Sequence, residues 1–332
     1  MNGDETIPEM SVPVGSPRLD IVMVNWNSGT QLRKCLESIA VAKQDNYRLS
    51  RVVVVDNASV DASAEGFGNL DFQLEVIRNR TNCGFAAACN QGARESSSDY
   101  LLFLNPDTRL FEDSLDKPIT FMEDPSNRKV GIVGIQLIDD RGEAHRSCTR
   151  FPKPRHFLAQ MLGLDRLFPQ HFPSHFMTTW DHRESRAVDH VMGAFYLIRR
   201  RLFESLKGFD ERFFVYLEDL DLSYRAHQAG WHSFYLAEIK AYHKGGGTSE
   251  QIKSVRLFYS LRSRILYGFK HFRRWTASGL MLGTLFLEPL IRSSWSLARF
   301  TLRELSETMQ AYWMLWRGIP GVMRMLRRDL SV

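Results

Sequence analysis

The stretch LDIVMVNWN, residues 19–27, decides the fold of this chain. It is a nearly continuous apolar run rich in Val and Ile, which is typical of a β-strand buried on both faces. Similar runs follow at residues 51–59, 74–79, 99–108, 129–139, 187–200 and 231–238. Apolar residues at helical spacing come between the first runs, behind Ser28 as a helix cap and again at residues 84–95. This alternation predicts an α/β fold with a mostly parallel sheet wound with helices.

The composition of the 332 residues is that of an ordinary globular protein, with 44% apolar and 24% charged residues. Four cysteines form no CxxC pair and no zinc spacing, so we expect a reducing, cytoplasmic environment. Residues 1–18 are polar and have no apolar signal core, and we interpret them as a short disordered leader. Prolines interrupt residues 140–187, which we predict to be an irregular, partly mobile segment over one face of the sheet.

Positive charge is concentrated in the last part of the chain. From Ile252 onward there are 14 Lys/Arg against 4 Asp/Glu, whereas residues 1–251 hold 29 against 34. On a helix from about residue 291, an apolar stripe is formed by Trp295, Leu302, Leu305, Met309, Trp313 and Trp316. A basic helix with such a stripe is typical of an anionic membrane surface, and its Leu, Phe and Met content disfavours a nucleic-acid partner.

The alternative for this tail is a helix packed on the rest of the chain or on a second copy, as in a homo-oligomer. The longest uncharged apolar run, residues 275–287, has 13 residues. That is too short for a helix that must cross a hydrocarbon core of about 30 Å. We therefore expect a protein attached peripherally to the inner face of the cell membrane.

Polar side chains follow three of the predicted strands at their carboxyl ends, which are Asn25 and Asn27, Asp56 and Asn57, and Asn105 and Asp107. Ligands of open parallel sheets bind at this edge, although the same residue types also simply end strands. The chain has neither GxGxxG after the first strand nor a GxxxxGK[ST] loop, which disfavours NAD and P-loop chemistry. The pattern favours a nucleotide site of carboxylate and amide groups, with Asp107 able to hold a divalent cation on phosphates.

Six segments together resemble glycosyltransferase family 2, in particular the rhamnosyltransferase-like branch that builds bacterial O-antigen and cell-wall polysaccharide. They are VNWNS, VVVVDNASVD, NCGFAAACNQG, LLFLNPDT, the long stretch from GAFYLIRR to YRAHQAG, and YHKGGGTS. The likeness covers about residues 19–249. It implies a GT-A domain there, with the basic amphipathic helices of residues 250–332 as a separate tail.

The resemblance implies an inverting transfer of a sugar, rhamnose-like and carried by dTDP or UDP, to a hydroxyl of a lipid-linked or polysaccharide acceptor. It assigns the donor to the first strand ends and to two later residues, a set comprising Asn25, Asn27, Asp56, Asn57, Asn82, Asn90 and Asn105. Asp107 stands in the place of the metal-binding DxD motif, whose first acid is replaced by Asn105. His243 resembles the histidine of the family that adds a further contact to Mg²⁺ or Mn²⁺.

In the stretch RFFVYLEDLDLSYRAHQAGW, residues 212–231, an aromatic run is followed directly by three carboxylates. Acids at the start of a helix complement its dipole, and Asp221 and Arg225 have the spacing of an ion pair. An inverting transfer also needs a carboxylate base held beside partly dry walls. The Glu218-Asp219 pair resembles the ED motif of the family, so we predict Asp219 as the base, with Glu218 orienting it or touching the acceptor.

Two further residues have less specific readings. Gly193 could let backbone approach the sugar, or could be a packing glycine. His190 is interpreted as a packing residue. Other function classes remain open, namely a different hexose or galactofuranose transferase, a sugar nucleotidyltransferase and a catalytically inactive scaffold on the membrane.

Overall fold

The computed structural model describes residues 15–245 and 253–328, and most of the predicted leader lies outside these ranges. Its main sheet has the strand order β3-β2-β1-β4-β10-β6-β11-β5, and β8 pairs with β11. The strands are β1 (Arg18–Asn25), β2 (Arg48–Asp56), β3 (Leu74–Arg78), β4 (Tyr100–Leu104), β5 (Thr108–Leu110), β6 (Val130–Ile138), β8 (Arg186–Val188), β10 (Phe195–Arg199) and β11 (His232–His243). A small second sheet joins β7 (Cys148–Thr149) and β9 (His190–Val191).

Six of the nine strands run in the same direction, so the sheet is mostly parallel, as predicted from the apolar runs; they are β1, β2, β3, β4, β6 and β11. The exception at its centre is β10, which runs antiparallel between β4 and β6. Phe195, at the start of β10, therefore pairs with Leu104 at the end of β4. This reversal brings the residues just before β10, including Gly193, to the edge where the parallel strands end.

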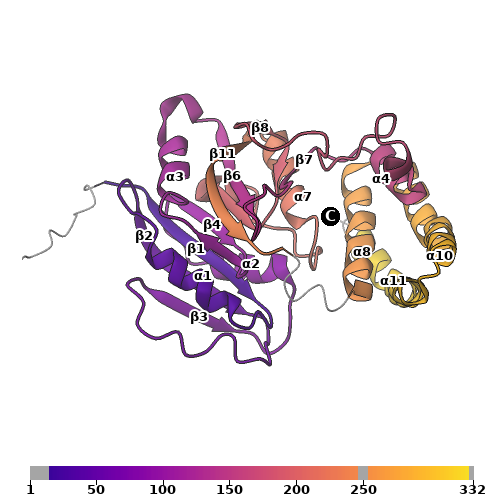
Figure 1. Ribbon diagram of the computed structural model, residues 1–332, viewed down its shortest axis with the longest axis horizontal. Coiled ribbons are helices and arrows are strands. Elements are labelled where there is room, and N and C mark those ends of the chain that lie inside the picture. The colour runs from indigo at the N-terminus through magenta and orange to yellow at the C-terminus, as the bar shows by residue number, and fades with distance from the viewer. Residues whose placement is uncertain (1–14, 246–252, 329–332) are drawn as a thin grey trace, which may run out of the picture.

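Helices cover both faces of the sheet (Figure 1), with α1 (Gln31–Ala40) and α3 (Asp116–Glu123) on one face and α2 (Phe85–Ala93), α6 (Arg200–Ser205) and α7 (Glu218–Gln228) on the other. Alternation along β1 explains the two layers, because Ile21 and Met23 pack under α1 while Val22 packs under α2. Helix α2 lies so close that a Cβ atom at Gly92 would be 2.6 Å from Val22 Cγ1.

Two local predictions were wrong. Ser28 does not cap α1, because its hydroxyl donates to Asn25 Oδ1 and the helix begins behind Thr30. Residues 140–187 are not wholly irregular, since they contain α4 (Pro154–Leu162) and α5 (Leu164–Leu167). Proline is tolerated at the first position of a helix, where no backbone N–H is needed, so Pro154 starts α4 instead of preventing it.

The tail is helical, as predicted, but the helix expected from about residue 291 is not continuous. Its elements are α8 (Lys253–His271), α9 (Arg274–Leu282), the π-helical turn η3 (Gly283–Leu287), α10 (Glu288–Ala298) and α11 (Leu302–Arg328). The chain turns between α10 and α11, where Phe300 has a φ of 54°. Trp295 therefore lies on a different helix from the rest of the predicted stripe.

These tail helices form a core of their own against the sheet domain, with α8 nearest to α7 (Figure 1). Phe213 and Leu220, from the acidic stretch, join Ile265 of α8 and Tyr312 of α11 in one apolar cluster. Inside the tail, the buried Glu288 accepts hydrogen bonds from Arg264 and Arg292. No helix in the described residues is both long and apolar enough to span a bilayer.

Candidate active site

The ends of the parallel strands lie together along one edge of the sheet. Asn25 is in register with Asp56, and the amide of Asn57 donates to the carbonyl of Asn25 at 2.8 Å. On the other side of β1, the amide of Asn105 donates to the carbonyl of Ala194 at 3.0 Å. Residues predicted from three separate strands are thus brought to one edge, as expected for a parallel sheet.

Asn25 is fully buried and holds Asp56 in place. Its side-chain amide donates to Asp56 Oδ1 at 2.8 Å, to Ser63 Oγ at 2.8 Å and to Ser59 Oγ at 3.0 Å. Asn27 fixes the same loop, because its Oδ1 accepts from the amide of Val60 at 2.8 Å. Of these residues, Asp56 is therefore the candidate for direct recognition of a base, and the two asparagines keep it and its loop in position.

The later asparagines organise the segment from the end of β2 to α2. Asn57 donates to the carbonyl of Gly84 at 3.1 Å, and Asn82 Oδ1 accepts from the amide of Gly84 at 2.9 Å. Asn90 makes a two-way contact with Phe209, donating at 2.8 Å and accepting at 2.9 Å. The amide of Asn90 thus anchors the loop before the acidic stretch onto α2.

The acid pair opens α7 at the same edge of the sheet. Tyr216 and Leu217 have φ values of 70° and 66°, so two left-handed residues turn the chain just before Glu218. Asp219 Oδ2 accepts from the amide of Gly193 at 2.8 Å, and its Oδ1 accepts from the amide of Leu220 at 2.8 Å. A Cβ atom at position 193 would lie 3.0 Å from Asp219 Oδ2, so the close approach predicted for Gly193 is made to this carboxylate.

Glu218 differs from its neighbour in burial. Its Oε2 is buried and has no hydrogen-bond partner among the described residues. Burial, followed by the nearby charge of Asp219, raises the pKa of Glu218 well above its usual value. Glu218 therefore holds its proton to a higher pH than an ordinary carboxyl. The side chain of Asp219 is 18% exposed and accepts two backbone hydrogen bonds.

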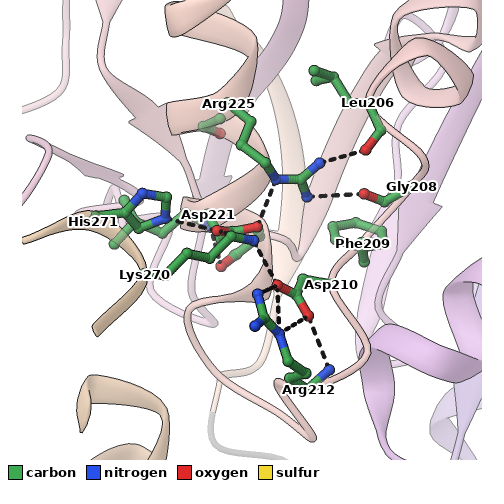
Figure 2. Close-up of polar contacts among 12 residues, drawn as sticks. Leu206, Gly208, Phe209, Asp210, Arg212, Asp221, Arg225, Lys270 and His271 are labelled. Atoms are coloured by element: carbon green, nitrogen blue, oxygen red, sulfur yellow. Dashed lines mark hydrogen bonds and ion pairs between the residues drawn. The ribbon is translucent and has the colours of Figure 1, made fainter. Parts of the chain in front are cut away.

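Asp221, one turn into α7, is the centre of an ionic cluster, which Figure 2 shows. The carboxylate is fully buried and lies 2.8 Å from Arg225 Nε, 2.7 Å from Lys270 Nζ and 2.7 Å from His271 Nε2. Burial alone would raise the pKa of Asp221, but the hydrogen bond from His271 and the charges of Arg225 and Lys270 outweigh it and lower the pKa.

The same cluster reaches the loop between α6 and α7. Arg225 also donates to the carbonyls of Leu206 and Gly208, at 2.6 and 2.9 Å, and Lys270 Nζ lies 2.5 Å from Asp210 Oδ2 (Figure 2). The predicted pair of Asp221 and Arg225 is confirmed. The contacts from α8 are an addition that sequence spacing could not show, since His271 is 50 residues away.

Asp107 and His243 meet because β5 pairs with the end of β11. His243 is in register with Thr108, and its Nε2 lies 3.3 Å from Asp107 Oδ1. His243 Nδ1 is buried without a partner in the described part of the chain. The described ranges contain no group of three or more His, Cys, Asp or Glu residues arranged to hold a metal. Two protein ligands are nevertheless enough for Mg²⁺ when phosphates and water complete its shell, so the pair fits a phosphate-bound cation.

The sequence did not point to His190 as part of this site. Its Nε2 lies 3.6 Å from Asp219 Oδ2, and the imidazole is buried. The only signal was its position three residues before Gly193, which also contacts Asp219.

A sheet of this topology, with an acid pair, a strand-end aspartate and an Asp–His pair at its carboxyl edge, defines a glycosyltransferase of the GT-A fold. The fold resembles that of the mannosyltransferase PcManGT from Pyrobaculum calidifontis, solved with GDP-Man and Mn²⁺, with a TM-score of 0.51 and 18% identity. The match covers 96% of this chain and 81% of that one.

The chain belongs to glycosyl transferase family 2, whose model matches residues 20–207. It is 25% identical over 278 residues to N-acetylglucosaminyl-diphospho-decaprenol L-rhamnosyltransferase of Mycobacterium tuberculosis, covering 78% of this chain and 87% of the relative. It is 24% identical over 255 residues to the rhamnosyltransferase WbbL of Escherichia coli, covering 74% and 91%. The predicted family is confirmed, and both of these relatives are named rhamnosyltransferases, as the predicted resemblance implied.

Proposed function

We propose that this glycosyltransferase moves a rhamnose-like sugar, with inversion, from a dTDP- or UDP-sugar to a hydroxyl of a lipid-linked or polysaccharide acceptor. The observation that carries the proposal is the seat of Asp219, whose carboxylate is anchored at 2.8 Å by the amide of Gly193 at the same sheet edge as Asp56 and Asp107. The relatives' names support a rhamnosyl donor, and one of them names a diphospho-decaprenol acceptor.

Asp219 acts as the general base of this reaction. The acceptor oxygen forms a bond to the anomeric carbon while the bond from that carbon to the diphosphate oxygen breaks, and the hydroxyl proton passes to Asp219. The nucleoside diphosphate leaves from the opposite face, so the configuration inverts. We assign Glu218, whose pKa is raised by burial, the role of orienting Asp219 or of donating a hydrogen bond to the acceptor sugar.

In the donor site, Asp56 accepts a hydrogen bond from the nucleobase, and Asn25 and Asn27 hold the loop of Asp56 in position. Asp107 and His243 would hold a divalent cation on the diphosphate. When bound, such a cation offsets the negative charge that develops on the leaving diphosphate. Asn105 supplies no second carboxylate here, so the cation depends on the donor phosphates for much of its shell.

The tail supports membrane attachment through side chains that its own core leaves exposed. Large apolar residues with more than half of their surface exposed gather on α9, η3, α10, α11 and the turns beside them, namely Trp275, Leu282, Phe286, Leu290, Leu297, Phe300, Leu302 and Trp313. Arg299 and Arg317 lie over the rings of Trp295 and Trp313, so basic groups lie beside two exposed tryptophans of the tail. Exposed patches of this kind are typical of a membrane or partner contact.

Transfer assays with the full chain test the proposal. We expect the dTDP- or UDP-sugar to be consumed only when a lipid-linked or polysaccharide acceptor is present. NMR of the product should show that the anomeric configuration is inverted. Asp219→Asn should lower kcat by about 10² to 10⁴ while the thermal shift caused by the donor persists. The matched control is Asp113→Asn, whose carboxylate pairs with Lys117 on an exposed surface. Retained configuration, or an Asp219→Asn variant as active as the parent, would contradict the proposal.

An inactive membrane scaffold predicts a different result. Such a protein would bind liposomes but consume no donor in the presence of any acceptor. A different hexosyltransferase would lose the same activity in Asp219→Asn but would use another donor sugar. A panel of nucleotide sugars therefore separates it from the proposed transferase of a rhamnose-like sugar.

A further inference from the structure

We propose that His190 is a positioning residue for the base Asp219, acting as a neutral imidazole whose Nε2–H is aimed at the carboxylate by a buried chain through Ser223 and Tyr196. The inference deepens the proposed function and rests on Asp219 being the base. It gives a role to a histidine that the sequence alone assigns to packing.

Three elements meet to build this chain. His190 comes from β9, Ser223 from α7 and Tyr196 from β10, and all three side chains are buried. His190 Nδ1 lies 2.9 Å from Ser223 Oγ, which lies 2.9 Å from the hydroxyl of Tyr196. Ser223 is four residues after Asp219, on the same face of α7, so the helix itself carries both ends of the arrangement.

The direction of the hydrogen bonds follows from the carboxylate. If Ser223 donated to Tyr196, His190 Nδ1–H would donate to Ser223 and a bare Nε2 lone pair would face the Asp219 oxygen 3.6 Å away. In the opposite direction Tyr196 donates to Ser223, Ser223 donates to His190 Nδ1, and Nε2–H faces Asp219. In this second direction no lone pair of His190 faces a lone pair of Asp219. The arrangement therefore favours the tautomer that carries its proton on Nε2.

The surroundings keep the imidazole neutral and the phenol protonated. Burial lowers the pKa of His190, against the opposite effect of Asp219 and Asp189. His175 and Tyr196 also interact with His190, and Glu218 and Cys89 lie in the field of Asp219. Burial also raises the pKa of Tyr196, so its hydroxyl remains a donor. A neutral imidazole can donate a hydrogen bond to the Asp219 carboxylate without transferring a proton to it.

The separation of 3.6 Å between Nε2 and Oδ2 is slightly longer than a hydrogen bond. Contacts in catalytic sites are often long without substrate and shorten in the complex. Asp219 Oδ2 already accepts from the amide of Gly193. A second hydrogen bond to this oxygen, from His190 Nε2–H, favours the carboxylate form of Asp219 and restrains rotation of its side chain. Loss of that donor should therefore make the base hold its proton up to a higher pH.

The test compares His190→Phe, which removes the donor, with His190→Gln, whose side-chain N–H can replace Nε2–H. In pH profiles of kcat, which report the enzyme–substrate complex, we expect the acidic limb of His190→Phe to move up by about one to two pH units and that of His190→Gln to stay near the parent. His227→Gln, an exposed histidine of the same helix, is the matched control and should not move it. An acidic limb unchanged in His190→Phe would overturn the proposal, even if kcat falls.

A second measurement does not depend on activity. Long-range ¹⁵N–¹H correlation spectra of the full chain report which ring nitrogen of His190 carries the proton. We expect the Nε2–H tautomer in the parent and a mixture in Ser223→Ala, a small change that keeps the fold if His190→Phe does not. An Nδ1–H tautomer in the parent would refute the chain. If Asp219→Asn is fully active, the base assignment fails instead, whatever the tautomer of His190.

Discussion

Replacing Asp221 by Asn should destabilise the protein far more than replacing an exposed carboxylate. The Asp221 side chain is fully buried and lies within 2.8 Å of Arg225, Lys270 and His271. Removing one partner of a buried ion pair costs about 3–5 kcal/mol, because the remaining charges stay buried with less compensation. At about 2 °C per kcal/mol for a protein of this size, the melting temperature of Asp221→Asn should fall by about 6–10 °C at pH 7.

The pH dependence follows from the lowered pKa of Asp221 in the folded protein. Its stabilisation is present above the pKa of an unfolded aspartate, about 3.9, and is lost as the pH falls through the lower folded value. The gap in melting temperature between parent and Asp221→Asn should therefore be full at pH 7 and narrow below about pH 4.

Circular dichroism melts at pH 7 and pH 3 provide the assay. Asp113→Asn is the control, since its pair with Lys117 is exposed on both sides, and its melting temperature should match the parent. The reasoning is refuted if Asp221→Asn melts within about 2 °C of the parent at pH 7, or if the gap is as wide at pH 3.

Three other outcomes are expected. Asp107→Ala should weaken donor binding in calorimetry with Mn²⁺ or Mg²⁺ but hardly with EDTA, and an equal loss in both would exclude a metal role. Gly193→Ala should lower kcat by about tenfold or more with little change in melting temperature, because its Cβ would lie 3.0 Å from Asp219 Oδ2 and displace the carboxylate. Full-length protein should sediment with anionic liposomes, with binding reduced but not abolished by salt, and Phe300→Ser, Trp313→Ser should lose the salt-resistant part. No sedimentation of the parent at low salt would rule out membrane attachment.

Much of the sheet was predictable because its strands are buried on both faces and read as unbroken apolar runs. β1 and β2 lie within the residues expected, apart from a few at their starts. Such runs carry no information on direction, so the antiparallel course of β10 could not be predicted. The break at Phe300 was equally hidden, because apolar spacing near three to four continued across the turn between α10 and α11.

The candidate site was predictable where its residues form a local motif. Glu218 and Asp219 follow an aromatic run, and strand-end polar residues fall where a parallel sheet must gather them. Partners from distant segments leave no local trace. His271 meets Asp221 across 50 residues, and Asn90 meets Phe209 across 119, through contacts that no short-range period encodes.

The ionic cluster also orders events during synthesis of the chain. Asp221 is made 50 residues before His271, which at about 5–20 residues per second is a delay of about 3–10 s. Through that interval the carboxylate has Arg225 but none of its α8 partners, so the first turn of α7 cannot be buried against the tail. Asp221, two residues after the candidate base, therefore gains its partners from α8 only after that helix has been translated, and a nascent chain that already holds the whole acidic stretch still lacks these two ion pairs.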